Sequence, residues 1–319
     1  MTIRDRPRRF SARNTAGRER HDRHDITDAM RFAITAVDRY LGVFDAFVAA
    51  GWTPLKLFTV PARSDQGNQQ AVVAYAERNG AAIQLSRMTA RDLAELRDRG
   101  CEALIVASYD WKVCDWRPYL KYAVNFHASP LPDGRGPYPV VRAILEDRAV
   151  WGVTCHQLSP EIDRGDMLAR EEFPLQADEC HESLDLKIQM AARRLASRVA
   201  GRFAQLWEQA EPQRGGGYWR KHAVAEHVID FRNPTESVLR HVRAFGVNGS
   251  LACVDGVWFV VKRAVGWAEQ HGHPPGRAVH VFNRSIVVAA GDGYVGLLDS
   301  ERAPPGVVAE IGAAPGRAA

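Results

Sequence analysis

From Arg31 onward, short apolar runs alternate with stretches that carry apolar residues at helical spacing. The apolar runs have the length and composition of buried strands, and they occupy residues 32–37, 55–60, 81–85, 103–108 and 122–127. The helical patterns lie at 41–50 and 69–78, and residues 89–92 form a capped helix start. Strands and helices that alternate in this way predict right-handed βαβ units. We therefore expect an α/β fold with a Rossmann-like, mostly parallel sheet and helices on both of its faces.

The second half of the chain has a different pattern. A long helical stretch at 182–209 would close the first domain, and the Pro/Gly-rich residues 211–217 indicate a linker. A short helix is expected near 235–245. The strand-like pieces that remain are separated by Gly and Asn turns and lie at 251–254, 258–263, 277–282, 285–290 and 294–298. Such a series predicts a smaller C-terminal β-rich domain of OB-like type.

These patterns divide the chain into five parts. Residues 1–29 are highly charged, have few apolar positions and show no periodicity, so we expect a disordered extension. The α/β domain covers 30–210, the linker 211–224 and the β-rich domain 225–301. The Ala-, Gly- and Pro-rich residues 302–319 are expected to form a flexible tail.

Composition and charge exclude a membrane or secreted protein from our expectations but do not indicate a function. The 319 residues are 46% hydrophobic and 25% charged, and the net charge of +4 does not identify a partner. No stretch approaches the roughly 18 consecutive apolar residues of a membrane span, so no membrane partner is expected. The Arg-rich start has no apolar segment of secretory type. The five cysteines are scattered without a C-x-x-C pair, which fits a reducing compartment, and we expect a cytoplasmic protein.

Candidate chemistry begins at the end of the run 122–127. Asn125 and His127 lie two residues apart, so a strand places both side chains on one face of the sheet. The carboxyl ends of strands in open parallel sheets are where ligands bind. Either residue alone, near the end of a strand, is more often a hydrogen-bonded turn residue than a catalyst. Downstream, 152–156 reads as a strand, and the polar turn 161–167 is able to return Asp163 to the same crevice.

The other histidines and motifs give little indication of a catalytic, metal or nucleotide site. His156 on its strand is interpreted as a core or supporting residue. His271 and His273 lie in a Gly/Pro loop without nearby partners, and no metal site is expected. A glycine-rich dinucleotide fingerprint is missing after the first strand, where residues 37–42 read VDRYLG, so a nicotinamide enzyme is not expected.

Four blocks together resemble the folate-dependent formyltransferases. They are Asn125-x-His127-Ala-Ser-x-Leu-Pro132, Arg135-Gly-x-x-Pro139, Gly152-Val-Thr154 and Ile162-Asp163-x-Gly165-Asp-Met167. Their order and spacing are far more specific than any one block. The resemblance covers about residues 30–210 well, and it extends more weakly to 229–238, 243–245 and 275–276. This family includes enzymes that formylate initiator tRNA and enzymes that formylate sugar nucleotides.

The resemblance implies a donor and a set of site residues. The donor would be 10-formyltetrahydrofolate, and the catalytic set would be Asn125, His127 and Asp163. Asn125 and a protonated His127 would donate hydrogen bonds to the oxyanion that forms when an amine attacks the formyl carbon, while Asp163 would orient His127 and raise its pKa. The pterin would lie against Tyr109, Trp111, Lys112 and Val113. Arg135 and Tyr138 are candidates for the acceptor side.

Departures from the family pattern bear on the acceptor. Pro130 stands where the family usually has Leu, which affects the loop after His127. Family members that act on tRNA carry a basic loop after the second strand, whereas residues 62–70 contain a single basic residue here. We therefore expect a small-molecule amine, above all a nucleotide-linked amino sugar, and tRNA less. Hydrolysis of the donor, a catalytically silent folate sensor and a homodimer are left open.

Overall fold

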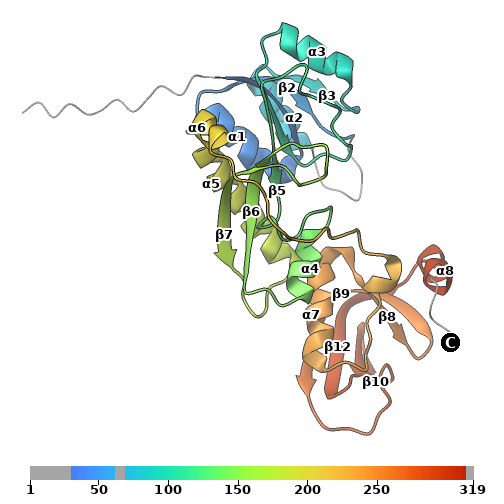
Figure 1. Cartoon of the computed structure of the whole chain (residues 1–319). Coiled ribbons are helices and arrows are strands. Elements are labelled where there is room, and N and C mark those ends of the chain that lie inside the picture. The colour runs from blue at the N-terminus through green and yellow to red at the C-terminus, as the bar shows by residue number, and fades with distance from the viewer. Residues whose placement is uncertain (1–29, 62–68, 314–319) are drawn as a thin grey trace, which may run out of the picture.

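The structure is a computed structural model that describes residues 30–61 and 69–313. It consists of two domains, and helix α4 of the first packs against helix α7 of the second (Figure 1). The expected extension at 1–29 lies outside the described residues, as do residues 314–319 and most of the segment 62–70. Among the described residues, no helix is both long enough and apolar enough to cross a membrane.

The first domain is built on a seven-stranded sheet. Its strands have the order β3-β2-β1-β4-β5-β6-β7. Strands β1 to β5 are parallel, and β6 and β7 join at one edge in antiparallel pairing. The prediction of a mostly parallel sheet is confirmed, although β7 was not predicted. The strand bounds are β1 Arg31–Ala36, β2 Thr53–Phe58, β3 Ala82–Gln84, β4 Ala103–Ala107, β5 Tyr122–His127, β6 Val150–Gln157 and β7 Met167–Pro174.

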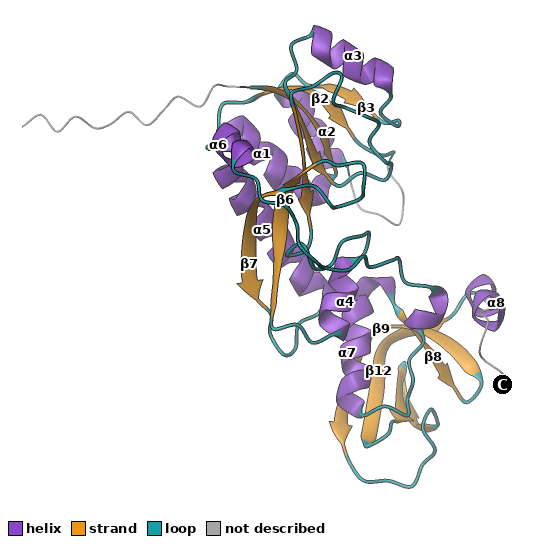
Figure 2. Ribbon diagram, viewed as in Figure 1, coloured by secondary structure: helices purple, strands orange, loops and turns teal. Residues whose placement is uncertain are grey.

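Helices cover both faces of this sheet, as predicted (Figure 2). One face carries most of the helices and the larger apolar core, which includes Phe32, Phe47 and Leu195. The other face is covered by α3 and by the loop after β4, through Leu93, Trp116 and neighbours. The helix bounds are η1 Asp38–Tyr40, α1 Leu41–Ala49, α2 Gln70–Arg78, α3 Ala90–Asp98, α4 Pro139–Leu145, α5 His181–Ala200 and α6 Phe203–Glu208.

The second domain is a five-stranded antiparallel sheet of order β10-β11-β12-β9-β8. Helix α7 covers it with Val238 and Val242, which lie in the same apolar core as Val261 and Val295. The predicted β-rich domain is confirmed. Its elements are η2 Val224–His227, α7 Thr235–Phe245, η3 Gly246–Asn248, β8 Ser250–Val254, β9 Val257–Ala268, β10 Ala278–Phe282, β11 Ser285–Ala289 and β12 Gly293–Arg302.

The expected flexible tail from 302 requires a correction. Helix α8 (Pro305–Ala313) follows β12 directly, and its Ile311 is buried in a small apolar cluster with Val228 and Leu251. Proline is tolerated in the first turn of a helix, where its missing N–H would have no partner. The Ala-, Gly- and Pro-rich composition suggested disorder. Ile311, and Val307 one helical turn before it, instead pack helix α8 against the β-rich domain.

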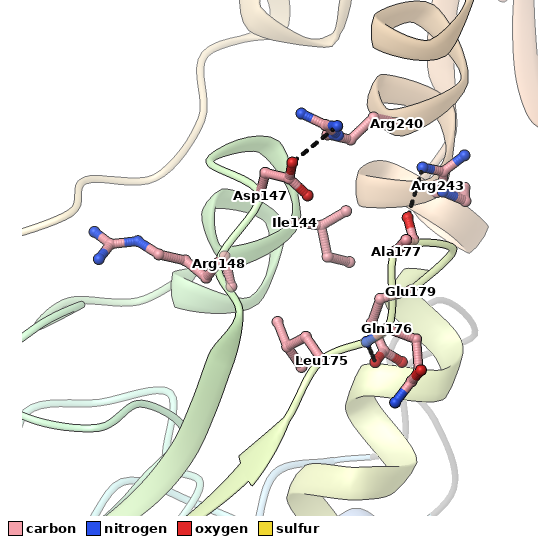
Figure 3. Close-up of a pocket in the computed structure, with 10 residues that line it drawn as sticks. Ile144, Asp147, Arg148, Leu175, Gln176, Ala177, Glu179, Arg240 and Arg243 are labelled. Atoms are coloured by element: carbon pink, nitrogen blue, oxygen red, sulfur yellow. Dashed lines mark hydrogen bonds and ion pairs between the residues drawn. The ribbon is translucent and has the colours of Figure 1, made fainter.

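The two domains meet through a polar contact (Figure 3). Arg240 on α7 forms an ion pair with Asp147, with Nη2 and Oδ2 3.0 Å apart, and Arg243 Nη2 donates to the carbonyl of Ala177 at 3.2 Å. The hollow between these residues has a volume of about 10 Å³. That volume is enough for one water molecule, so this interface is no candidate for a substrate site.

Half-buried histidines surround Phe245 beside the same interface. The ring centroids of His222, His227 and His241 lie 5.5, 4.1 and 4.9 Å from that of Phe245. His181 Nδ1 lies 3.2 Å from the carbonyl oxygen of Ala244, which accepts its hydrogen bond. Burial lowers the pKa values of His181, His222 and His241 below the ordinary 6.5. These side chains are therefore neutral in the folded protein over a range in which the unfolded chain protonates them.

We expect the free energy of unfolding to fall by about 1–3 kcal/mol between pH 7.5 and 5.5. The unfolded chain binds protons below pH 6.5 that the folded state binds only at lower pH, so stability falls as the pH falls. Urea denaturation at several pH values measures this effect. The variant His241→Gln should flatten the profile, whereas the same change at the exposed His280 should not. A free energy of unfolding that is constant over this range would contradict the expectation.

Candidate active site

Strand pairing places the candidate residues of β5 at one edge of the sheet. Asn125 lies opposite Val106 of β4 on one side and opposite His156 of β6 on the other. His127 is the last residue of β5 and pairs with Thr154. Parallel strands end at a common edge, so Asn125 and His127 lie beside the loop that follows β4. The predicted two-residue period therefore brings both side chains to the carboxyl edge.

A tight turn between β6 and β7 returns Asp163 to this edge. Asp163 has a φ of 53°, in the left-handed region, which costs a residue other than glycine roughly 1–2 kcal/mol. The turn also needs Gly165, because a Cβ there would lie 1.8 Å from the carbonyl oxygen of Gln157. The backbone is thus held in a costly conformation at the residue that carries the carboxylate.

The three predicted catalytic residues come together around that carboxylate. His127 Nδ1 lies 3.6 Å from Asp163 Oδ1, and Asn125 Nδ2 donates to the same oxygen at 3.3 Å. The backbone N–H of Gly136 donates to Asp163 Oδ2 at 2.9 Å. The His127 and Asp163 side chains are each only 10% exposed. An amide, an imidazole and a carboxylate therefore form one compact, nearly buried group.

His156 belongs to the same group. Its Nε2 lies 3.1 Å from Asn125 Nδ2 and 3.7 Å from Asp163 Oδ1. Its Nδ1 lies 2.8 Å from the carbonyl oxygen of Gln157, so Nδ1 carries a proton and the Nε2 of the neutral ring accepts from Asn125. This geometry suits the supporting role considered for His156. Only the β5–β6 register reveals its contact with Asn125.

The hydrogen bonds and burial also set the charge state of His127. Its Nε2 lies 2.8 Å from the carbonyl oxygen of Gly134, which can only accept, so Nε2 carries a proton and Nδ1 of the neutral ring faces Asp163. Burial lowers the pKa of His127, and this outweighs the upward effect of Asp163. The expected upward effect of Asp163 is therefore present, but burial of the ring has the larger effect.

Asp163 shows the opposite balance. Burial alone would raise the pKa of its carboxyl, but His127 and His156 in their protonated forms, together with the Gly136 N–H, lower it to about 2. At neutral pH the site therefore holds a carboxylate beside a neutral imidazole. Such a pair is suited to accept a proton at His127 Nδ1 and to stabilise the resulting imidazolium.

The expected folate loop lies at the same edge. Tyr109 is half-buried, its hydroxyl accepts the Met88 N–H at 2.6 Å, and its ring centroid lies 5.3 Å from that of Trp111. Val113 is half-buried against the second apolar cluster, and Lys112 is exposed. A half-buried, partly apolar loop beside the catalytic group fits a planar heterocycle. The Tyr109 oxygen accepts one hydrogen bond from the protein, and its O–H is still able to donate to a ligand.

The two acceptor-side candidates differ in exposure. Arg135 is only 6% exposed, and its Nη2 donates to the Gly216 carbonyl at 2.8 Å, so this arrangement braces the loop. Tyr138 is 38% exposed, with Lys221 Nζ 5.6 Å from its ring centroid. Tyr138 is therefore more open to a ligand than Arg135.

Over residues 30–61 and 69–313, no group of three or more His, Cys, Asp or Glu side chains could hold a metal ion.

Both domains match families of known proteins. The family model described as "Formyl transferase" matches residues 67–200, and "Formyl transferase, C-terminal domain" matches residues 222–304. The two matches correspond to the two domains of the structure. Asn125, His127 and Asp163 all lie within the first match.

Similar sequences and structures agree with this. A methionyl-tRNA formyltransferase of Halorhodospira halophila is 31% identical over 78% of this chain and 84% of its own length. Another from Janthinobacterium sp. is 31% identical over 63% of this chain and 65% of its own length, so the match spans just under two thirds of that relative. A Helicobacter canadensis N-formyltransferase, solved with folinic acid and dTDP-3-aminofucose, superposes with a TM-score of 0.63 at 16% identity, over 85% of this chain and 99% of the other. At that identity the superposition supports the fold alone.

Proposed function

Because the chain belongs to the formyl transferase family, we propose that it transfers a formyl group from 10-formyltetrahydrofolate to an amine. The observation that carries this proposal is the meeting of Asn125, His127 and Asp163 at the carboxyl edge of β5. An amine attacks the formyl carbon of the donor, and the bond from that carbon to the folate nitrogen breaks, so that tetrahydrofolate leaves with the proton that the amine loses. A cytoplasmic location fits the five free cysteines.

His127 acts as the proton acceptor in this proposal. Its Nδ1 carries no proton in the neutral ring and lies 3.6 Å from the Asp163 carboxylate, so it can take the proton that the attacking amine loses. The imidazolium then lies 3.6 Å from the Asp163 carboxylate, in surroundings that exclude most water. Charge interactions are strong in such surroundings, which favours proton transfer as the new C–N bond forms.

Asn125 stabilises the oxyanion in this proposal. Its amide N–H groups are directed to Asp163 and His156, and either can turn toward an oxyanion that forms beside them. The imidazolium N–H of His127 is a second donor. Loss of one such donor typically costs on the order of 10²–10³ in rate. The folate donor is assigned to the loop with Tyr109, Trp111, Lys112 and Val113, which lies beside Asn125.

The acceptor we propose is the amino group of a nucleotide-linked amino sugar. The single basic residue in 62–70 argues against extensive phosphate neutralisation, and the exposed Tyr138 ring beside Lys221 suits a base or a phosphate. Arg135 and Tyr138 are the acceptor-side residues in this proposal. A second candidate is the amine of charged initiator tRNA, supported by 31% identity to methionyl-tRNA formyltransferases.

A direct assay separates these acceptors. The protein is mixed with 10-formyltetrahydrofolate and a panel of nucleotide-linked amino sugars, charged tRNA or buffer, and both tetrahydrofolate release and formylated product are measured. We expect kcat/KM for one amino sugar to exceed that for tRNA by at least about 10²-fold, because a fitted polar site rejects ligands that leave its groups unpaired. A preference for tRNA would support the second candidate. Equal release of formate without an acceptor would indicate hydrolysis, and no turnover at all would overturn the proposal.

A further inference from the structure

The linker between the domains is attached to both loops of the candidate active site. Next to the turn that carries Asp163, Glu211 and Met167 exchange two backbone hydrogen bonds, of 2.8 and 3.0 Å. Farther along, the Trp219 N–H donates to the carbonyl of Arg135 at 2.6 Å, in the loop after His127. The linker therefore connects the segment that supplies the carboxylate with the segment that follows the imidazole.

Between these two attachments, Gln213 reaches the catalytic turn directly. Its Nε2 donates to the carbonyl oxygens of Asp163 and Gly165, both at 2.8 Å. One side-chain amide thus bridges the carbonyl of the left-handed residue itself and the carbonyl two residues further along the turn. Asp163 keeps this disfavoured backbone conformation while its carboxylate contacts His127 and Gly136. An external donor that fixes both carbonyls opposes relaxation of the turn.

The linker is also held closely at Gly216. A Cβ at Gly216 would lie 2.0 Å from the carbonyl oxygen of Pro132, in the loop after His127. The Gly216 carbonyl in turn accepts from the buried guanidinium of Arg135. Hydrogen bonds fix the linker to the Asp163 turn at Glu211 and to the loop after His127 at Gly216 and Trp219. These contacts set the position of Gln213 relative to the Asp163 turn.

We infer that Gln213 is a positioning residue of the reaction, which acts by holding Asp163 at its distance from His127. This inference rests on the proposed formyl transfer. Gln213 itself touches neither His127 nor Asn125, and its contacts are to backbone carbonyls. Its effect on the rate therefore passes through the Asp163 carboxylate.

The main test is the variant Gln213→Leu, which has a similar size but no donor. We expect kcat to fall about 10- to 100-fold with little change in either KM, because a small displacement of a catalytic group is costly. The acid limb of the kcat/KM profile should move to lower pH, since a more distant carboxylate stabilises the His127 imidazolium less. The control Gln209→Leu, at an exposed position just after α6, should leave kcat and the pH profile unchanged. An unchanged acid limb in Gln213→Leu would overturn the inference.

Two further measurements distinguish failure of the inference from a folding defect and from failure of the proposed function. Gln213→Asn keeps the polarity but is too short to bridge both carbonyls, so it should reproduce the effect if Gln213→Leu fails to fold. NMR titration of the His127 ring, assigned with His127→Gln, should show a lower pKa in the folded Gln213 variant than in the wild type. The titration needs no turnover, so it separates failure of this inference from failure of the proposed function. An identical His127 titration in both proteins would contradict the positioning role.

Discussion

Replacement of Asp163 with asparagine is expected to lower kcat by about 10³–10⁴-fold, with much smaller changes in KM. Asparagine keeps the size of the side chain but removes the negative charge 3.6 Å from His127 Nδ1. The imidazolium that forms as the amine loses its proton then has no counter-charge in a nearly buried site. Steady-state kinetics at saturating donor and acceptor measure the loss.

The pH profile distinguishes this explanation from a general disruption. In the wild type, kcat/KM should fall on the acid side as His127 becomes protonated, below the ordinary pKa of 6.5 because burial lowers it. In Asp163→Asn this limb should lie at still lower pH. The control Glu161→Gln removes an exposed carboxylate from the same turn and should change kcat less than about twofold. A loss of less than tenfold in Asp163→Asn would remove Asp163 from the catalytic set.

The sequence predicts the parts of the site that depend on short-range pattern. The spacing of Asn125 and His127 follows from the two-residue period of a strand, and their position at the carboxyl edge follows from the alternation of strands and helices. Asp163 needed the family resemblance, because a polar turn alone does not say where its side chain points. The structure brings these three side chains together, with Asn125 hydrogen-bonded to Asp163 and His127 Nδ1 3.6 Å from the same carboxylate oxygen.

Other parts depend on long-range contacts that no local pattern contains. The contact between His156 and Asn125 requires the antiparallel register of β5 with β6, which joins residues 31 positions apart. The bonds of Gln213 to the Asp163 turn require the path of the linker across the domain. The lowered pKa of His127 depends on burial by many segments, so the nearby carboxylate, which raises this pKa as expected, does not by itself give the net direction.

Replacement of His127 should be as damaging as replacement of Asp163, but it should spare folate binding. His127→Ala removes the only proton acceptor proposed for the amine, and general base catalysis typically contributes about 10²–10⁴ in rate. We therefore expect kcat to fall by at least about 10³-fold, since the same change also removes one donor to the oxyanion. The folate contacts that we propose lie on the loop after β4, which truncation of His127 should leave in place. Calorimetry should therefore give a folate Kd within about threefold of the wild-type value.

The hydrogen bond of His127 to Gly134 requires a second variant. His127→Ala also frees the Gly134 carbonyl, and part of its effect therefore reflects a displaced loop. His127→Gln retains an amide donor that can reach this carbonyl but cannot accept a proton at neutral pH, so it should be nearly as slow as His127→Ala. The exposed His280→Ala is the matched control and should retain full activity. Rates near the wild-type value in His127→Gln would show that the ring holds the loop and takes no proton, and the catalytic role assigned to His127 would then be wrong.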